Sequence, residues 1–240
     1  MYRVVKELGR GTYGIIYLIE KTLPNSAVQQ FAFKTGGQFD IRKEYAVTKK
    51  VSGQPGIIQT FGTKQIPEID PNVGILLEYN PLNWDLQSYY HAHPITYQKF
   101  KSIFTQFIDI LEVLKVNEVS HGDIKATNTL YNEETGKIKL IDFGGGCFRG
   151  GIDCATVPTF PSPKIESYNN GDRKTRRTWQ DILDNDVYGV IFTMKNMAKD
   201  LGWRYSGCIR FCRMLLRNYN RMTLNELRFL VEQADLRYDP

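Results

Sequence analysis

The stretch Ser120–Gly146, SHGDIKATNTLYNEETGKIKLIDFGGG, holds two aspartates, Asp123 and Asp142, that stand nineteen residues apart. Strand-like TLY and KIKLI flank the turn EETG, and this order predicts a hairpin. A hairpin brings the two carboxylates to one rim of a site. There they repel each other unless one of them holds a cation or a proton. The stretch therefore predicts a site that binds a cation.

Asn128 and Lys125 add two further groups to this rim. The side-chain amide of Asn128 offers a neutral oxygen, and magnesium prefers oxygen ligands. Lys125 puts a positive charge two residues after Asp123, which suits a migrating phosphoryl group. We expect Asp142 and Asn128 to hold Mg²⁺ while Asp123 orients a hydroxyl.

The chain around this stretch divides into two parts. The first eighty residues are rich in short β-branched or aromatic runs, RVVKEL, GIIYLIE, QQFAFKT, IIQTFG and GILLEY, with one helical pattern at DIRKEYAVTKKV. After Asn80-Pro81 the patterns become helical, first in YQKFKSIFTQFIDILEVLKV and later in DVYGVIFTMKNMA and GCIRFCRMLLR. The fold class is therefore α+β with two lobes. We expect an N-lobe of about 1–79, a hinge of about 78–82, a C-lobe of about 83–240, and a ligand cleft between the lobes.

Composition sets broad limits. The chain has 240 residues, of which 42% are hydrophobic and 24% charged, as in ordinary globular proteins. No apolar run approaches the ~20 residues of a membrane span, and the start lacks the apolar core of a signal peptide. The four cysteines form no CxxC pair, which fits free thiols in a reducing compartment, cytoplasmic or nuclear. The formal charge of +5 is mild and only slightly favours acidic partners.

The motifs together resemble those of eukaryotic-type protein kinases. HGDIKATN resembles the catalytic loop of that superfamily, and IDFG resembles its metal-binding triplet. Gly9–Ile16 resembles the glycine-rich loop, and Phe31–Lys34 resembles the third-strand motif with the phosphate-binding lysine. Leu77–Tyr79 resembles the hinge, and Asp186–Tyr188 the helix whose aspartate braces the catalytic loop. Six motifs in the correct order, spanning Leu8 to Arg221, form a strong joint signal.

The resemblance implies a two-lobed kinase that uses ATP and Mg²⁺ to phosphorylate Ser and Thr hydroxyls of proteins. Its catalytic residues would be Asp123, Lys125, Lys34 and Glu44, with Glu44 positioning Lys34, and its metal ligands Asn128 and Asp142. His121 would be a scaffold residue. The residues implied to contact the nucleotide are Leu8, Gly9, Gly11, Gly14, Ile16, Ala32, Lys34, Leu77, Glu78, Asn80 and Leu130.

Three positions depart from the pattern of that superfamily. Gly122 replaces the arginine before the catalytic aspartate, so we expect no need for a phosphate on the activation segment. Lys164 stands where a glutamate normally pairs with a late arginine, here Arg221, so another anchor is expected, with Glu166 as one candidate. By spacing, the threonine that contacts the catalytic aspartate falls at Val157, with Thr156 and Thr159 nearby.

The departures leave alternatives open. The HGD loop resembles that of vaccinia-related kinases, and the trimmed chain resembles viral kinases acting in a host cell. A pseudokinase that only binds proteins is one alternative. An atypical small kinase like those of the tRNA-modifying machinery is another.

Basic residues could attract partners. They form one cluster at Arg173–Arg177 and a second at helical spacing, Arg210, Arg213 and Arg217. A solvated face is the commoner explanation, and an acidic docking protein is the sharper one. No aromatic platform interleaves the arginines, so nucleic acid is not expected as a partner. No membrane partner is expected either, and the oligomeric state stays open.

Overall fold

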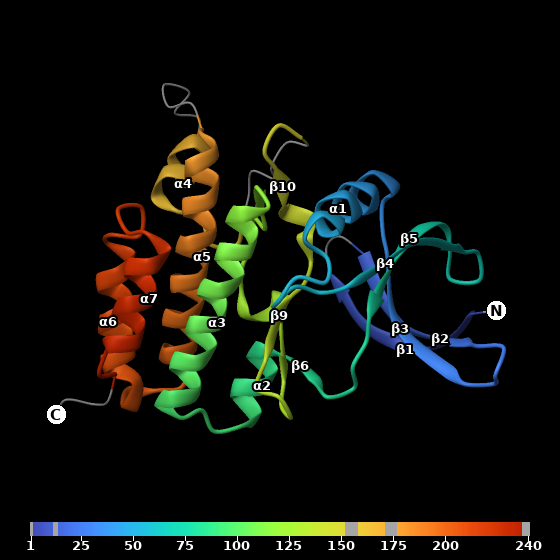
Figure 1. Cartoon of the computed structure of the whole chain (residues 1–240), viewed down its shortest axis with the longest axis horizontal. Helices are drawn as coiled ribbons and strands as arrows, with labels where there is room; N and C mark the ends of the chain where they lie inside the picture. Colours follow the sequence, from blue (N-terminus) through green and yellow to red (C-terminus); the bar gives the residue numbers. More distant parts are fainter. Residues whose placement is uncertain (1, 12–13, 152–157, 171–176, 237–240) are drawn as a thin grey trace.

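A five-stranded antiparallel sheet forms the smaller lobe of the computed structural model, which describes residues 2–11, 14–151, 158–170 and 177–236 (Figure 1). The strand order is β1-β2-β3-β5-β4. Helix α1 (Gln38–Val51) packs against β4 and β5 and turns Ile41, Val47 and Val51 into the core. The strands are β1 (Tyr2–Gly11), β2 (Gly14–Thr22), β3 (Val28–Thr35), β4 (Thr60–Ile66) and β5 (Asp70–Glu78).

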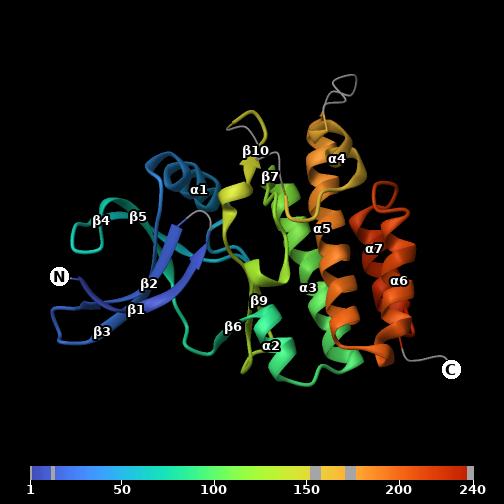
Figure 2. The ribbon, with the colours of Figure 1, turned by 180° about the vertical axis from the view of Figure 1, so that it is seen from behind.

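The larger lobe is mainly helical, and Figure 2 shows it from the opposite side. Its helices are α2 (Leu86–Ala92), α3 (Tyr97–Val116), α4 (Pro163–Asn169), α5 (Trp179–Asp200), α6 (Ser206–Leu216) and α7 (Leu224–Gln233). Two small sheets face the other lobe. One has the order β6-β8-β9, from β6 (Asn83–Asp85), β8 (Thr129–Asn132) and β9 (Ile138–Leu140), and the other pairs β7 (Val119–Ser120) with β10 (Cys147–Phe148). The α+β, two-lobed class predicted from the sequence is therefore confirmed.

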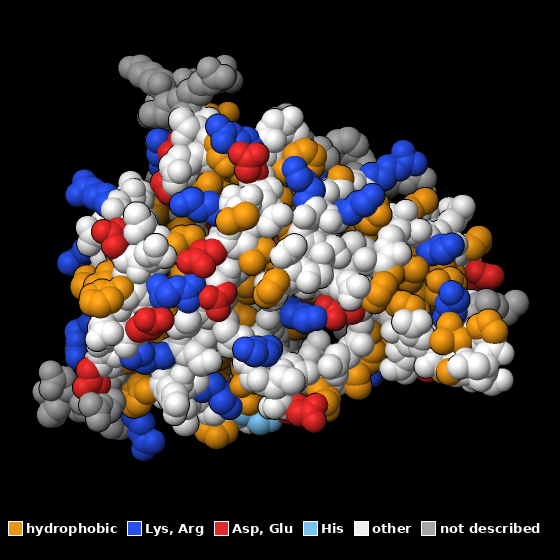
Figure 3. Space-filling model, in the orientation of Figure 1, with side chains coloured by type: hydrophobic (Ala, Val, Ile, Leu, Met, Phe, Trp, Pro, Cys, Tyr) orange, Lys and Arg blue, Asp and Glu red, His pale blue; other side chains and the backbone are white. Residues whose placement is uncertain are grey.

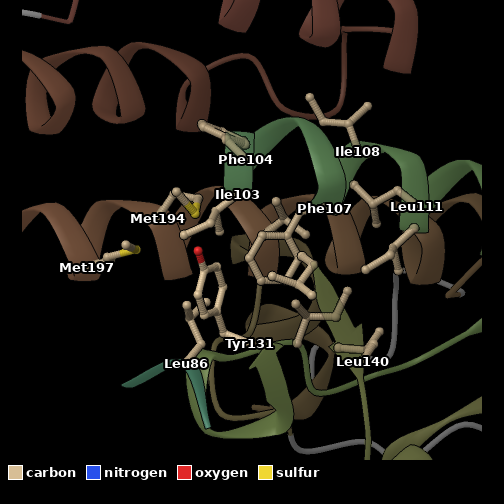
Figure 4. Packing of buried hydrophobic residues seen from close by; sticks show 14 of the residues in the cluster. Leu86, Ile103, Phe104, Phe107, Ile108, Leu111, Tyr131, Leu140, Met194 and Met197 are labelled. Atoms are coloured by element: carbon tan, nitrogen blue, oxygen red, sulfur yellow. The ribbon is translucent and has the colours of Figure 1, made fainter. Parts of the chain in front are cut away.

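The core of the large lobe lies between α3, α5 and the β8–β9 hairpin (Figure 4). Helix α3 begins after Thr96, whose hydroxyl accepts a hydrogen bond from the Lys99 N–H and so caps the first turn. Its predicted apolar stripe is buried throughout, at Phe100, Ile103, Phe104, Phe107, Ile108, Leu111 and Leu114. Met194 and Met197 of α5 fill the gap from the other side. The β8–β9 hairpin thus packs against the buried faces of α3 and α5.

One predicted strand is displaced. The run IIQTFG predicts a strand from residue 57, but β4 begins at Thr60. Ile57 and Ile58 are instead buried between the lobes, where the Ile58 N–H donates to the Leu140 carbonyl of β9 at 3.1 Å. A short apolar run marks burial and does not by itself say against which element the burial occurs. Here it ties the small lobe to the hairpin of the large lobe.

Two expectations from composition have different outcomes. In the part of the chain that the structure describes, no helix has the length and apolarity needed to span a membrane. Cys208 and Cys212 are free and buried, whereas Cys147 is disulfide-bonded, so the expectation of free thiols throughout is wrong. A disulfide needs two cysteines that lie close in space and does not need CxxC spacing.

Candidate active site

A cleft of about 590 Å³ lies between the two lobes and contains every site residue predicted from the sequence. The small lobe supplies Leu8, Gly9, Gly11, Gly14, Ile16, Ala32, Lys34, Glu44, Leu77 and Glu78, and the connection to the large lobe supplies Asn80. The large lobe supplies Asp123, Lys125, Asn128, Leu130 and Asp142. Residues up to 134 positions apart in the chain thus face one space (142 − 8 = 134).

Lys34 joins the lobes at the back of this cleft. Its ammonium lies 2.8 Å from Glu44 Oε2 of α1 and 2.8 Å from Oδ1 of Asp142, beyond β9. Lys34 and Glu44 are both buried. Burial alone would raise the pKa of Asp142, but the charge and the hydrogen bond of Lys34, together with smaller contributions such as the bond from the Gly144 N–H, hold that pKa below its usual value. A carboxylate kept charged in this position suits a cation ligand.

Glu44 differs from Asp142 because it is almost fully enclosed. Burial raises the pKa of Glu44 to about 7, although the Lys34 ammonium works against the rise. Asp142 adds a further negative charge, which raises the pKa of Glu44 as well. The ion pair at the back of the cleft is therefore sensitive to pH near neutrality.

Asp123 accepts hydrogen bonds on both carboxylate oxygens. Lys125 Nζ lies 2.6 Å from Oδ2, and Asn128 Nδ2 donates to the same oxygen at 3.2 Å. The Thr159 N–H donates to Oδ1 at 2.7 Å. Burial works against the charged form, but the bonds from Lys125 and Thr159 hold the pKa of Asp123 below its usual value. Asp123 is therefore a charged acceptor at the mouth of the cleft.

The loop that carries Asp123 is held from below by α5. Asp186 is buried and accepts the backbone N–H groups of His121 and Gly122, each at 2.9 Å. His121 accepts the Asp123 N–H on Nδ1 at 3.2 Å, so its Nε2 carries the hydrogen toward the Ile141 carbonyl at 2.9 Å. Both ring nitrogens of His121 are satisfied, in agreement with its predicted scaffold role.

Gly122 has a structural reason to be glycine. Its φ of +76° is strained for residues with a side chain, and an added Cβ would lie 2.4 Å from the Gly145 carbonyl oxygen. An arginine at this position would force the loop to move. The absence of a side chain here is part of the packing between the Asp123 loop and the turn after Asp142.

The segment after residue 157 is anchored differently from the expected pattern. Lys164 Nζ lies 2.5 Å from Asp181 Oδ1 at the start of α5. Within the described residues, neither Glu166 nor Arg221 makes an ion pair, and the charged anchor of the segment is Lys164 on Asp181. The Ser162 N–H also donates to Asn185 Oδ1 of α5 at 2.9 Å, in a buried position. The anchor thus has a cation on the segment and carboxylate and amide groups on the helix.

Thr159 occupies the place that spacing assigned to Val157, which lies outside the described residues. Its N–H reaches Asp123, and its hydroxyl oxygen accepts from Lys125 Nζ at 2.9 Å. The shift of two residues could not be read from spacing because loop length varies freely between fixed elements. Lys125 therefore links the loop and the segment directly.

The front of the cleft is an apolar slot. Ala32 and Leu77 of the sheet are buried above Leu130, with Leu8 and Ile16 beside them. Ile58 and Ile141 also line this space and were missed. Strand alternation would place the side chain of Ile141 on the opposite side from the Asp142 carboxylate, so the pattern offers no reason to expect both in one cleft. The strand ends at Leu140, and both side chains line the cleft. A flat aromatic base fits such a slot.

The glycine-rich turn leaves room above the cleft. An added Cβ at Gly9 or Gly11 would meet nothing within 4 Å, so backbone there is open to the cleft. At Gly14 the reason is different, because its φ is +151° and a Cβ would lie 1.7 Å from the Thr35 carbonyl oxygen of β3. Open backbone N–H groups over a cleft are suited to phosphate.

The family model of the protein kinase domain matches residues 2–152. The chain belongs to the protein kinase family. Its match ends just after β10, whereas the segment anchor and α5 lie beyond it. Asp186 of α5, which lies beyond that match, accepts two backbone hydrogen bonds from the loop that carries Asp123.

Curated kinases share this similarity at low identity. The chain is 27% identical over 159 residues to calcium-dependent protein kinase 29 of Arabidopsis thaliana, which covers 62% of the chain and 29% of that protein. It is 25% identical over 158 residues to cyclin-dependent kinase 4 of Mus musculus, covering 60% and 51%. It is 31% identical over 174 residues to the serine/threonine-protein kinase pakG of Dictyostelium discoideum, covering 68% and 14%.

The chain thus spans about half or less of the length of these relatives. The resemblance to vaccinia-related kinases, the viral source, and the cytoplasmic or nuclear location stay predictions.

The kinase cleft offers oxygen ligands of the kind that Mg²⁺ prefers. Asn128 donates its Nδ2 hydrogens to the Asp123 backbone oxygen and carboxylate, which leaves Asn128 Oδ1 as an acceptor beside the cleft. Asp142 supplies the charged oxygen. Among the described residues no group of three or more His, Cys, Asp and Glu side chains converges on a metal site.

Proposed function

We propose that this chain is a single protein kinase domain, residues 1–240, that transfers the γ-phosphoryl group of ATP to Ser and Thr hydroxyls of proteins. The observation that carries the proposal is the Lys34 ammonium, 2.8 Å from both Glu44 and Asp142, in the same cleft as the charged Asp123. Family membership supports phosphoryl transfer, and the names of the relatives support Ser/Thr over Tyr.

Each residue has a role that follows from its position. Leu8, Ile16, Ala32, Leu77 and Leu130 enclose the adenine, while the backbone at Glu78 and Asn80 bonds its edge. Gly9, Gly11 and Gly14 let backbone approach the phosphates. Lys34 binds phosphate oxygens, and Glu44 fixes Lys34. Asn128 and Asp142 would hold Mg²⁺, which neutralises phosphate charge when bound.

Asp123 would accept the hydrogen bond of the acceptor hydroxyl and orient it. Its low pKa favours this positioning role, because a strongly held carboxylate is a weak base. Lys125, 2.6 Å from Asp123, supplies positive charge beside the transferred group. Together the two residues place a nucleophile and a counter-charge at the same edge of the cleft.

We further propose that the activation segment needs no phosphate. Four contacts already hold it: Thr159 with Asp123, Lys125 with Thr159, Ser162 with Asn185, and Lys164 with Asp181. Gly122 has no side chain that could bind a phosphate, and the buried Ser162 is poorly placed to carry one. Thr156 and the basic residues Arg173, Lys174 and Arg176 lie outside the described residues.

The pseudokinase alternative now has less support. It rested on Lys164 and Val157, and both departures have structural substitutes in Asp181 and Thr159. Nothing in the cleft favours the small tRNA-related kinases. An unidentified acidic docking protein stays part of the proposal and is developed in the next subsection.

The test is transfer of label from [γ-³²P]ATP with Mg²⁺ to a generic basic and a generic acidic protein, followed by phosphoamino acid analysis. We expect label on Ser or Thr, and we expect Lys34→Met to remove it. Lys64→Met is a matched control, because Lys64 is exposed on β4, away from the cleft. Nucleotide binding without any transfer would identify a pseudokinase instead.

A further inference from the structure

A second cavity, of about 460 Å³, adjoins the nucleotide cleft. Its walls are α2, the last turns of α5, the loop 125–127 and Thr159-Phe160. It shares Lys125 and Thr127 with the nucleotide cleft. In both ribbon views α2 and the C-terminal end of α5 lie at the same end of the large lobe (Figures 1 and 2). The hydrogen bond from Tyr90 to Asp200 joins these two helices at 3.0 Å.

The cavity starts beside the reacting centre. Lys125 Nζ is 2.6 Å from Asp123 and 2.9 Å from the Thr159 hydroxyl, and both Lys125 and Thr159 line the cavity. An extended peptide advances about 3.3 Å per residue. A peptide whose hydroxyl lies at Asp123 therefore places a side chain within a few residues of that hydroxyl into this cavity. Phe160 packs against Phe192 of α5, with ring centroids 4.7 Å apart and the ring planes inclined at 34°.

The charges around the cavity favour an anion. Lys199 is exposed at its edge. Lys195, one turn earlier on α5, places its ammonium 3.6 Å from the centroid of the Phe192 ring and feels the charges of Lys199 and of Arg213 on α6. Within the described residues none of these three cations makes an ion pair. Burial lowers the pKa of Lys195, and the neighbouring charges of Arg213 and Lys199 lower it further, which reports that the cations crowd each other.

The lining offers little to a basic side chain. Gln87, Thr127 and Asn196 are neutral. The carboxylate that lines the cavity, Asp200, already accepts from Tyr90 at 3.0 Å and lies 3.7 Å from His91 Nε2. On the face shown in Figure 3, basic and acidic side chains are intermixed.

We propose that this cavity binds an anionic side chain of the protein substrate, close in sequence to the acceptor Ser or Thr. The shared chemistry is a carboxylate or a phosphate, from Asp and Glu or from a previously phosphorylated residue. Lys199, supported by Lys195 and Arg213, provides the counter-charge, and the neutral lining donates hydrogen bonds. The substrate class is thus an acidic segment, and this inference rests on the proposed kinase function.

The test compares peptides with one Ser in a neutral background. Each carries Asp, phosphothreonine, Arg or Ala at one position, scanned about four residues to either side. Binding by fluorescence anisotropy and turnover as kcat/KM are both measured. We expect an anionic residue at one or two positions to improve both over Ala by about tenfold, the scale of one charge-assisted hydrogen bond. Comparison of Asp with phosphothreonine identifies which source of negative charge fits better.

Two variants locate the effect. Lys199→Gln should bring the ratio of acidic to Ala peptides close to one, whereas Lys64→Gln on β4 should leave the ratio unchanged. Asn196→Glu adds a carboxylate to the lining and should shift the preference toward Arg. Asn196 is partly exposed, so this change does not bury a charge.

The outcomes separate the two proposals. Turnover without an acidic preference, or with a preference that Lys199→Gln and Asn196→Glu leave intact, refutes the cavity assignment while the kinase function stands. Absence of turnover, with acidic peptides still bound preferentially in a Lys199-dependent way, refutes the kinase function while the cavity assignment stands. Absence of any binding preference and of turnover refutes both.

Discussion

Two ion pairs each join separate elements of this kinase, and they differ in whether function fixes the sign of each charge. The Lys34–Glu44 pair at the back of the cleft is buried and lies within the part that matches the family. The Lys164–Asp181 pair lies beyond that match, and Lys164 is 49% exposed. The first follows the family pattern residue by residue, whereas the second puts a cation where the pattern has an anion.

Chemistry explains the difference. In the proposed function Lys34 binds phosphate and must be positive, so its partner Glu44 must be negative. Lys164 and Asp181 line neither the cleft nor the second cavity and fasten a segment to a helix, so the sign of each charge is free as long as the two are opposite. The energies differ as well. Removing one partner of a buried pair costs about 3–5 kcal/mol, and a fully exposed pair contributes about 0–1 kcal/mol. The Lys164–Asp181 pair, in which only Asp181 is buried, lies between these limits.

The largest effect is expected where charge meets substrate. Asp142→Asn removes the charge of the proposed metal ligand and one ion-pair partner of Lys34. We expect phosphoryl transfer to fall on the order of 10³-fold or more, with the fold retained. Label transfer with Mg²⁺ and circular dichroism of the purified variant measure the two properties. Normal turnover in a folded Asp142→Asn protein would contradict the assignment.

The next effect concerns the acceptor rather than the nucleotide. Asp123→Asn should leave ATP binding unchanged and lower kcat by roughly 10²-fold or more, the scale for a positioned acid–base group. Lys34→Met should instead impair the productive nucleotide pose. Nucleotide titration and turnover, measured on both variants, separate the two roles. An unchanged kcat in Asp123→Asn would remove this residue from the catalytic set.

The buried pair should also give the enzyme a pH dependence. Burial raises the pKa of Glu44 to about 7, so Glu44 is protonated below that pH and the ion pair with Lys34 is lost. We expect kcat/KM for ATP to fall as pH drops below about 7. Glu44→Gln should lower the rate about tenfold at higher pH, equivalent to about 1.4 kcal/mol, and should lack this acid limb.

The free energy of unfolding should also depend on the protonation of Glu44, with the opposite pH trend from activity. Because its folded pKa lies above the ordinary 4.5, the folded state binds more protons between pH 4.5 and about 7. The contribution of Glu44 to stability is therefore lost as pH rises through this window, and Glu44→Gln should remove that loss. Urea titrations at both ends of the window measure it. Parallel stability curves for the two proteins would mean that Glu44 titrates at its ordinary pKa.

Changes at the Lys164–Asp181 pair should have a smaller effect on activity, and the effect should depend on the charge placed at residue 164. Lys164→Arg should behave like the parent, Lys164→Met should raise the KM for a peptide up to about fivefold, and Lys164→Glu should raise it further by facing Asp181. Arg221→Met is the control, because Arg221 makes no ion pair in the described part of the chain. An effect of Arg221→Met that exceeds that of Lys164→Met would restore the family's usual anchor.

Sequence reasoning succeeded where residue type is tied to chemistry. Asp123, Asn128 and Asp142 could be assigned to one rim because a hairpin between them fixes their distance. The buried stripe of α3 followed from its period. The helical period likewise located α5 and α6, although α5 starts seven residues earlier than its predicted run, at Trp179 rather than Asp186.

Sequence reasoning failed where only geometry decides. The partner of Lys164 lies seventeen residues away, at Asp181, and no local pattern links the two (181 − 164 = 17). The contact of Thr159 with Asp123 was not predicted, because the length of the segment is not fixed by strand pairing. The cavity beside α5 is formed by four separate elements and has no signature in any one of them. Short helices such as α2 and α4 were also missed, since seven residues give too few turns for a clear period.

The smallest expected effect is none at all, on removing phosphate from the activation segment. The segment is fastened to α5 by Lys164–Asp181 and by the Ser162 N–H on Asn185, and to the catalytic loop by Thr159. A phosphate usually supplies this kind of fastening by binding an arginine next to the catalytic aspartate. Here Gly122 stands at that position and packs too closely on Gly145 to be replaced.

Phosphatase treatment of the purified protein, with loss of phosphate verified by mass, should therefore leave the initial rate within about twofold of its starting value, since a loss below about 0.4 kcal/mol in transition-state stabilisation gives no more. Lys164→Glu gives the matched sensitised protein. In this variant the introduced glutamate repels Asp181, so the ion pair no longer holds the segment. If a phosphate contributes to holding the segment, phosphatase treatment should then lower the initial rate. If instead the parent loses its activity and regains it on rephosphorylation within residues 142–164, the segment depends on phosphate, and the ion pair with Asp181 is only part of its anchor.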